Sequence, residues 1–265
     1  QFTVRGTVIG GLILAGSLRS SHWIFAATII ANLCSFALGI LLSGRFCYRD
    51  APLKLSRVTE VMNFSLICLG TATAHYIYTS TDIIMLGKIA PWDVAAYGAA
   101  RSLTGVFTMV NEAANMVLLP LFSRMWNQGQ RHLIVGRAWS SVLIAEVILL
   151  PAFVALTFFP APVLDIVFSG RYTEGWPVTM LLGALIIVRP VGSYFSTAAL
   201  AVGKPQFSLY SVLISSAVNV GLNLLLIRGY GGFGAAAATG VAMILSTVWI
   251  VRKTVRYIGT REARE

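Results

Sequence analysis

Charged residues are scarce in this chain, and acidic residues are scarcer still. Only 11% of its 265 residues are charged, 10 Asp and Glu stand against 20 Lys and Arg, and 57% are hydrophobic. A soluble domain averages about 25% charged residues and could not bury so much apolar surface. The composition therefore excludes an ordinary soluble domain and indicates a chain that lies mostly in lipid, where helices satisfy their own backbone hydrogen bonds.

Motifs typical of enzymes, metal sites and nucleotide-binding sites are missing as well. The chain contains no HExxH, no phosphate-binding P-loop and no GxSxG nucleophile elbow. Its three cysteines, Cys34, Cys47 and Cys68, lack the spacing of a metal site or a disulfide framework. We therefore expect that the protein is not an enzyme and that it carries no metal and no cofactor.

Long apolar runs are what the sequence does contain. Most are about 20 residues long, the length that crosses a bilayer as an α-helix. We expect a short interfacial helix at 124–137 and a polar loop at 160–176 between these runs. The predicted fold is all-α, a polytopic transmembrane helical bundle of about eight spans at residues 4–18, 23–42, 58–78, 94–119, 139–159, 177–202, 207–227 and 233–251.

Arginine and lysine are concentrated in alternate loops. The clusters lie at 45–57, 124–137 and 252–264, with Lys204 at a fourth position, whereas the other loops are poor in basic residues. Because cytoplasmic loops carry the excess of Lys and Arg, this asymmetry predicts that both ends of the chain are cytoplasmic. The net charge of +10 then reflects the membrane topology, and it gives no reason to expect nucleic acid binding. We expect the basic loops to interact with anionic membrane lipids.

Five polar residues inside the expected spans are candidates for a substrate site. A charge at membrane depth costs about 2.5 kcal/mol or more unless it is paired or hydrated. Arg101 and Glu112 are eleven positions apart, close to three helical turns, so they share one helix face, which Asn111 and Asn115 flank. Arg189 lies in the middle of another span, beside a proline that should kink the helix. We expect a hydrated cavity for an anionic ligand, with a polar clamp between helices as the alternative.

Three further ionisable residues are candidates for coupling or gating. His75 and Asp82 are seven positions apart and share a face if their helix continues to Asp82, and Glu146 lies in the span at 139–159. Structural clamps are the alternative for all three. Asn219 and Asn223 stack on one face of their span, and we expect their side chains to form hydrogen bonds across helices.

Four segments follow one another in an order that resembles a known family. They are Thr81 to Gly87 (TDIIMLG), Ala96 to Ala100 (AYGAA), Phe168 to Tyr172 (FSGRY) and Gly229 to Ala236 (GYGGFGAA). The first two resemble the join between the seventh and eighth helices of polysaccharide exporters, the third their outer loop and the fourth their final hairpin. These exporters are lipid-linked oligosaccharide flippases of the multidrug/oligosaccharidyl-lipid/polysaccharide exporter superfamily.

The resemblance implies two six-helix lobes around a central cavity and an alternating-access motion. On this mapping residues 1–44 are the last two helices of an incomplete first lobe, and 45–57 are a basic cytoplasmic linker. Residues 58–252 are the second lobe, and 253–265 are a basic tail. The chain begins at Gln1 without a methionine, so we expect that an N-terminal portion is missing.

The function that the resemblance implies is transport of a polyprenyl-diphosphate-linked oligosaccharide across the bacterial inner membrane. A cationic cavity suits its pyrophosphate, because arginine pairs well with phosphate oxygens. The expected partners are the lipid-linked oligosaccharide, membrane lipids, and a polysaccharide polymerase with glycosyltransferases. A drug/cation antiporter of the same superfamily is the first alternative, followed by a membrane glycosyltransferase or ligase and by a scaffold without transport activity.

Overall fold

The computed structural model describes residues 29–30, 33–34, 37–38 and 55–262. The chain divides into two compact units, Gln1–Val58 and Thr59–Glu265. In the first unit the described residues are helical and comprise 29–30, 33–34 and 37–38, within the span expected at 23–42, and residues 55–58. The span expected at 4–18 and most of the basic linker lie outside the described residues. The fold that positions the candidate site is therefore that of the second unit.

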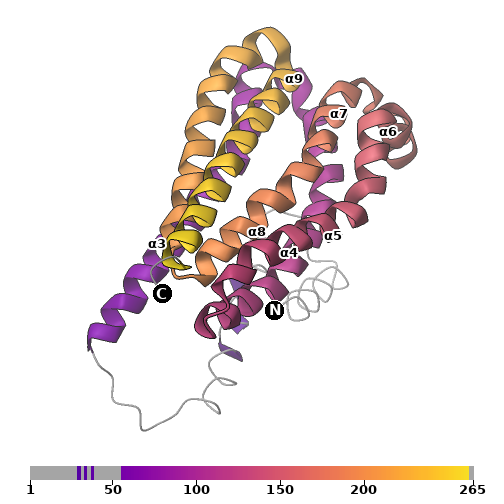
Figure 1. Cartoon of the computed structure of the whole chain (residues 1–265). Helices are drawn as coiled ribbons and strands as arrows, with labels where there is room; N and C mark the ends of the chain where they lie inside the picture. Colours follow the sequence, from indigo (N-terminus) through magenta and orange to yellow (C-terminus); the bar gives the residue numbers. More distant parts are fainter. Residues whose placement is uncertain (1–28, 31–32, 35–36, 39–54, 263–265) are drawn as a thin grey trace. The chain divides into compact units, whose positions relative to one another are not determined.

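The second unit is built from helices, and no strand occurs in the part of the chain that the structure describes. This finding confirms the predicted all-α fold (Figure 1). The elements are α3 (Leu55–Ile89), η1 (Pro91–Asp93), α4 (Val94–Asn127), α5 (Arg131–Phe158), α6 (Pro160–Phe168), η2 (Thr173–Gly175), α7 (Trp176–Ala184), η3 (Leu185–Ile187), α8 (Val188–Ala201) and α9 (Pro205–Glu262).

Four helical stretches in the described residues are long and apolar enough to cross a membrane. They are Pro91–Asn127, Arg131–Phe158, Thr173–Ala201 and Pro205–Thr260. Helix α3 has 35 residues and is long enough, but it is not one of the four. Its polar residues, among them His75 and Thr79, line a cavity and lower its hydropathy. On α5, Ile144 and Val147 are 62% and 73% exposed, as expected for a helix face that meets lipid.

Helix α9 contains the spans expected at 207–227 and 233–251 as two arms of one hairpin (Figure 1). The chain reverses at Gly231, whose φ of 52° and ψ of −132° suit a residue without a side chain. Ser211 on the first arm donates a hydrogen bond to the backbone oxygen of Ser246 on the second, at 3.2 Å. The predicted final hairpin is thereby confirmed, whereas the total number of membrane crossings stays a prediction.

The connector at 124–137 is not a separate interfacial helix, so that expectation is wrong. Helix α4 continues to Asn127 and α5 begins at Arg131, which leaves a join of three residues with Gly129 at a φ of 75°. The reason lies in tertiary packing, because Ile134 is fully buried in an apolar core with Phe122 and Ala138. Helices whose sides are covered in this way can extend beyond the bilayer.

The segment 160–176 and the following span also differ from expectation. Residues Pro160–Phe168 form α6 where a polar loop was expected, because Leu164 is fully buried and holds the segment against the bundle. The expected span at 177–202 is broken into α7 and α8 by η3. Pro190 has no N–H, and its ring clashes with the carbonyl of Ile186, four residues earlier and inside η3. The predicted kink therefore falls one turn before the proline.

The two ends of the bundle differ in charge. At one end Trp126 stacks on Tyr257 at 6.2 Å, and the Lys204 ammonium lies 5.2 Å from the same tyrosine ring. The α4–α5 join, the α8–α9 join and the end of α9 thus meet there, each with its basic residues (Figure 1). At the other end Asp93 accepts a hydrogen bond from the backbone N–H of Gly232, at 2.7 Å. The structure gathers these basic connectors at one end, and the assignment of that end to the cytoplasm stays a prediction.

Candidate functional site

A polar cavity of about 740 Å³ lies among α3, α4, α7, α8 and α9. All five residues expected at a substrate site line it, although they come from two helices. His75 and Asp82 line it as well, whereas Glu146 on α5 does not. The expected site residues on its wall are His75, Asp82, Arg101, Asn111, Glu112, Asn115 and Arg189.

The two arginines of the cavity are not neutralised by a carboxylate. Arg101 donates a hydrogen bond through Nη1 to the backbone oxygen of Thr79 on α3. Arg189 makes no hydrogen bond in the described part of the chain, and its Nε is buried without a partner. Neither guanidinium forms an ion pair with any side chain that the structure describes. Two positive charges with free donors therefore face one cavity.

The acid on the same helix does not compensate for Arg101. Glu112 lies eleven residues further along α4, about 16 Å along the axis at 1.5 Å per residue. Its side chain is exposed and forms no hydrogen bond among the residues that the structure describes. The cavity thus has separate cationic and anionic parts, and an anion near Arg101 would not be repelled at short range by Glu112.

The two asparagines of α4 attach this helix to α8. Asn115 donates to the Ser193 hydroxyl at 2.7 Å and accepts from the Thr197 hydroxyl at 2.8 Å. Asn111 accepts a hydrogen bond from the Tyr194 hydroxyl at 3.3 Å. These contacts give both amides a packing role on the cavity wall. A role in substrate binding stays a prediction.

Asp82 is the centre of a buried hydrogen-bond network. Its side chain is 4% exposed, and its Oδ2 accepts hydrogen bonds from the hydroxyls of Tyr97, at 2.7 Å, and Thr239, at 2.8 Å. Its Oδ1 accepts a hydrogen bond from Asn223 Nδ2 at 2.8 Å. Asn223 Nδ2 also donates to Asn219 Oδ1 at 3.1 Å, and Asn219 Nδ2 donates to Thr239 at 3.2 Å. The network joins α3, α4 and both arms of α9.

Sequence reasoning found part of this network. The prediction that Asn219 and Asn223 bond across helices is confirmed. Asp82, a candidate for coupling or gating, is buried, whereas the Glu112 side chain is exposed and that of Glu146 is half-buried. Thr239 was missed, although it lies eight residues after Gly231 and Asn223 lies eight residues before it. Because Thr239 and Asn223 are equally far from the glycine turn, their positions could have predicted that the two side chains lie at the same level of the hairpin.

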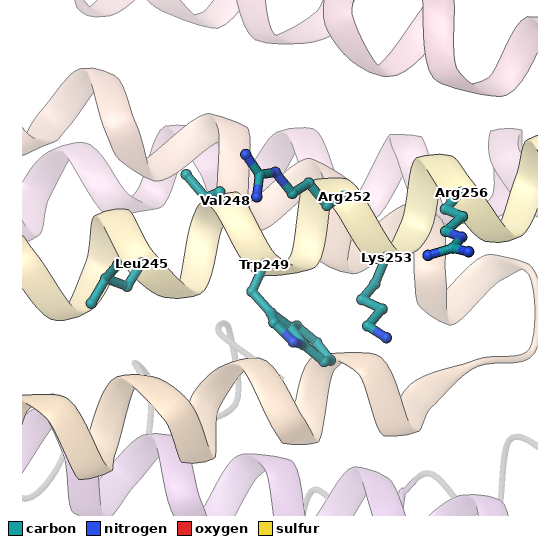
Figure 2. A pocket seen from close by; sticks show the side chains of 6 residues that line it. All are labelled: Leu245, Val248, Trp249, Arg252, Lys253 and Arg256. Atoms are coloured by element: carbon teal, nitrogen blue, oxygen red, sulfur yellow. The ribbon is translucent and has the colours of Figure 1, made fainter.

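A second hollow, of about 380 Å³, lies at the basic end. All of its lining residues come from the second arm of α9, so it is a surface feature (Figure 2). The Lys253 ammonium lies 5.9 Å from the Trp249 ring centroid, and Figure 2 shows both side chains on the same side of the helix. Tryptophan beside basic residues is typical of a membrane interface with anionic headgroups. The lining residues are Leu245, Val248, Trp249, Arg252, Lys253 and Arg256.

Comparisons with known proteins agree with this architecture. A family model described as "Polysaccharide biosynthesis protein" matches residues 2–177. The chain is 24% identical over 240 residues to a Haloferax volcanii protein named "Probable low-salt glycan biosynthesis flippase Agl15", with 90% of this chain and 50% of the relative covered. It is 24% identical over 219 residues to "Lipopolysaccharide biosynthesis protein WzxC" of Escherichia coli, with 78% and 44% covered. The chain spans half or less of the length of these relatives, and no solved structure matches it significantly.

Proposed function

Because the chain belongs to the polysaccharide biosynthesis protein family, we propose that it forms part of a flippase for a lipid-linked oligosaccharide. The residues 58–252 act as the second of two six-helix lobes, and the residues 1–44 contribute two helices of the first lobe. The substrate crosses between the lobes by alternating access. Named relatives that are about twice as long as the matched region support a second lobe, and their names support glycan export.

The observation that carries this proposal is the pair of unneutralised arginines on one cavity wall. Arg101 and Arg189 have no carboxylate partner in the described residues, and Arg189 has a buried Nε without an acceptor. Burying such charges in a membrane is costly unless water or an anion offsets them. A diphosphate supplies several oxygens in the geometry that guanidinium groups bind in a bidentate manner. The substrate is therefore a polyprenyl-diphosphate-linked oligosaccharide.

A drug/cation antiporter of the same superfamily is the second candidate. The observation in its favour is the buried carboxylate of Asp82, which such a protein could use to bind the coupling cation. The two arginines argue against it, because a cationic drug would be repelled by them. Transport of an anionic lipid-linked sugar accounts for both the cavity arginines and the buried carboxylate if a cation is also bound or transported.

Substitution of the cavity arginines tests the flippase proposal in the full-length protein. We expect Arg101→Ala or Arg189→Ala to reduce export of surface polysaccharide by about 10–100-fold, since a hydrogen bond to a charged group contributes about 1.5–3 kcal/mol. Lysine at either position should keep part of the activity, because the charge remains but the bidentate geometry is lost. Export is measured together with the abundance of each variant in the membrane.

The matched control is Arg228→Ala. Arg228 is exposed on α9 and does not line the cavity, so export should stay normal. Normal export by both cavity variants at normal abundance would refute the cationic-cavity mechanism. Uptake or efflux of cationic drugs by the wild-type protein, without an effect on polysaccharide, would favour the antiporter.

A further inference from the structure

One exposed face of the second arm of α9 changes from apolar to basic along its length. Val241, Leu245 and Val248 follow one another at intervals of four and three residues, so they form one stripe on the helix, and all three are exposed. Arg252 and Arg256 continue the stripe at intervals of four residues and are exposed as well. A phospholipid has the same order of parts, because its apolar chains end in a charged headgroup.

Packing on the opposite face fixes the rotation of this arm. Thr254 and Ile258 are buried, and the Thr254 hydroxyl donates a hydrogen bond to the backbone oxygen of Phe195 on α8, at 3.4 Å. Met243 and Thr247 line the polar cavity, which shares no lining residue with the hollow at the basic end. The apolar and basic stripe is therefore turned away from the substrate cavity and toward the outside of the bundle.

The basic part of the stripe lies at the depth of lipid headgroups. Arg252 comes twenty residues after Gly232 at the hairpin turn, a distance of about 30 Å at 1.5 Å per residue. The hydrocarbon core of a bilayer is also about 30 Å thick. With the turn at one surface of the core, Arg252 reaches the other surface, where the phosphates of the lipids begin. Leu245 and Val248 then lie inside the core, beside the acyl chains.

The positive charges of the hollow are not compensated. Three of its six lining residues are basic and none is acidic. Lys253 lies over the Trp249 ring, but the guanidinium groups of Arg252 and Arg256 make no hydrogen bond or ion pair with any group that the structure describes. Like charges one helical turn apart repel each other. A phosphate between the two arginines would relieve this repulsion, and guanidinium groups bind phosphate oxygens well.

The shape of the hollow suits a headgroup that carries chains. Its volume is about 380 Å³, and Figure 2 shows the Arg252 side chain lying back toward Val248. Trp249 meets Tyr210 of the first arm edge to face, with 6.3 Å between the ring centroids. Tryptophan and tyrosine favour the level of the headgroups. A free anion would use only the basic part of the hollow, whereas a lipid would use its apolar part too.

We propose that this hollow binds an anionic phospholipid, with its phosphate between Arg252 and Arg256 and one acyl chain along Leu245 and Val248. Lys253 adds a third positive charge, so a headgroup with two phosphates binds more tightly than a headgroup with one. The lipid is a bound partner of the fold and is not the transported molecule. The proposal goes beyond the flippase function and does not rest on it.

Lipid binding is testable on the purified full-length protein in detergent. Thermal unfolding is followed during titration with cardiolipin, phosphatidylglycerol or phosphatidylcholine at constant ionic strength. A ligand that binds only the folded state raises the unfolding midpoint as its concentration exceeds Kd. We expect a saturable rise with cardiolipin, the same rise at higher concentrations of phosphatidylglycerol, and little or none with phosphatidylcholine. Inorganic pyrophosphate, which has the charge without the chains, should have little effect.

Fluorescence quenching locates the bound lipid. Bromine atoms on acyl chains quench a tryptophan that they contact, and the difference between the wild type and Trp249→Phe isolates the signal of Trp249. In vesicles of equal bromine content, brominated phosphatidylglycerol should quench Trp249 more strongly than brominated phosphatidylcholine does. Equal quenching by the two lipids would mean that the hollow does not select an anionic lipid.

Two double variants with the same change in net charge separate the hollow from general attraction. Arg252→Gln with Arg256→Gln should raise Kd for cardiolipin about tenfold or more, because the contacts to phosphate are lost. Arg124→Gln with Arg137→Gln is the matched control. These two arginines are also exposed at the basic end, but they do not line the hollow. The control should keep the wild-type response, and all four side chains are exposed, so both proteins should fold.

Several results would overturn the proposal. One is a wild-type protein that anionic and zwitterionic lipids stabilise equally. Another is an equal loss of response in both double variants, which would mean that the lipid follows net charge alone. A third is stabilisation by pyrophosphate as strong as that by cardiolipin, which would make the hollow a site for a free anion. All of these measurements lack substrate and leave the cavity arginines intact, so they do not affect the export test.

Discussion

Replacing Gly183 by alanine should force α7 away from α5. A Cβ at this position would lie 2.7 Å from the Leu156 Cβ and 3.0 Å and 3.1 Å from the backbone carbon and oxygen of Leu156. Carbon atoms pack favourably at about 3.5–4.0 Å, so the two helices would have to separate by about 1 Å. Two of the close atoms belong to the backbone, and a change of rotamer in Leu156 cannot relieve them.

The expected cost follows from two opposing terms. Overpacking of a well-packed contact typically costs about 1–3 kcal/mol. Replacing glycine by alanine inside a helix gains about 0.5–1 kcal/mol, because alanine loses less conformational freedom. The net effect of Gly183→Ala is thus a loss of about 1–2 kcal/mol in the free energy of unfolding. Because α7 leads into the break before Arg189, export should fall as well.

A control variant tests this prediction closely, because it should change the unfolding midpoint in the opposite direction. Gly136 lies inside α5, and a Cβ there would meet no atom within 4 Å. Gly136→Ala should therefore raise the unfolding midpoint while Gly183→Ala lowers it. The assay is thermal unfolding of the full-length protein in detergent, with both variants measured side by side. Equal or higher stability of Gly183→Ala would refute the close α5–α7 contact.

Three further predictions concern the ends and the middle of the bundle. Asp93→Ala should cost about 1 kcal/mol in thermal unfolding, because it removes the acceptor of the Gly232 N–H at the hairpin turn; an unchanged midpoint would contradict this role. In a cysteine-free background Glu174→Cys should react with a membrane-impermeant reagent from outside and Thr260→Cys only after permeabilisation, whereas the reverse pattern would invert the topology. Asn115→Leu should destabilise the α4–α8 contact by about 1–3 kcal/mol, since two hydroxyls on α8 lose their partner, and wild-type stability would show that water replaces it.

Helical periodicity and hydropathy predicted most of the individual features of the fold. The two spans of the final hairpin follow from hydropathy, the kink in the span before Lys204 follows from its proline, and the shared face of Arg101 and Glu112 follows from helical spacing. The helix boundaries at 124–137 and 160–176 were wrong for one reason. Ile134 and Leu164 are buried by neighbouring helices, and this burial extends helical structure into segments that were expected to be a separate connector and a loop.

The candidate site was predicted only in part. Sequence reasoning singled out Asp82 and Asn223 separately, because Asn223 is a polar residue inside an expected span and Asp82 follows the span expected at 58–78. It could not bring them together, since they are 141 residues apart in the chain and on different helices. Glu146 lies on α5 and does not line the cavity, so its role in coupling or gating stays a prediction.

Four segments resemble the polysaccharide exporter family, and the sequence alone determined that the chain is a helical membrane protein. This information is local, because transfer into lipid depends on the composition of each run and on the charges beside it. Tertiary structure alone decided which polar residues share a cavity and which satisfy one another. Arg189 keeps a buried Nε without an acceptor, whereas Asp82 accepts hydrogen bonds from α4 and from both arms of α9. Such differences arise from helix packing in three dimensions, where the rotation of each helix sets which face meets lipid, a neighbour or the cavity.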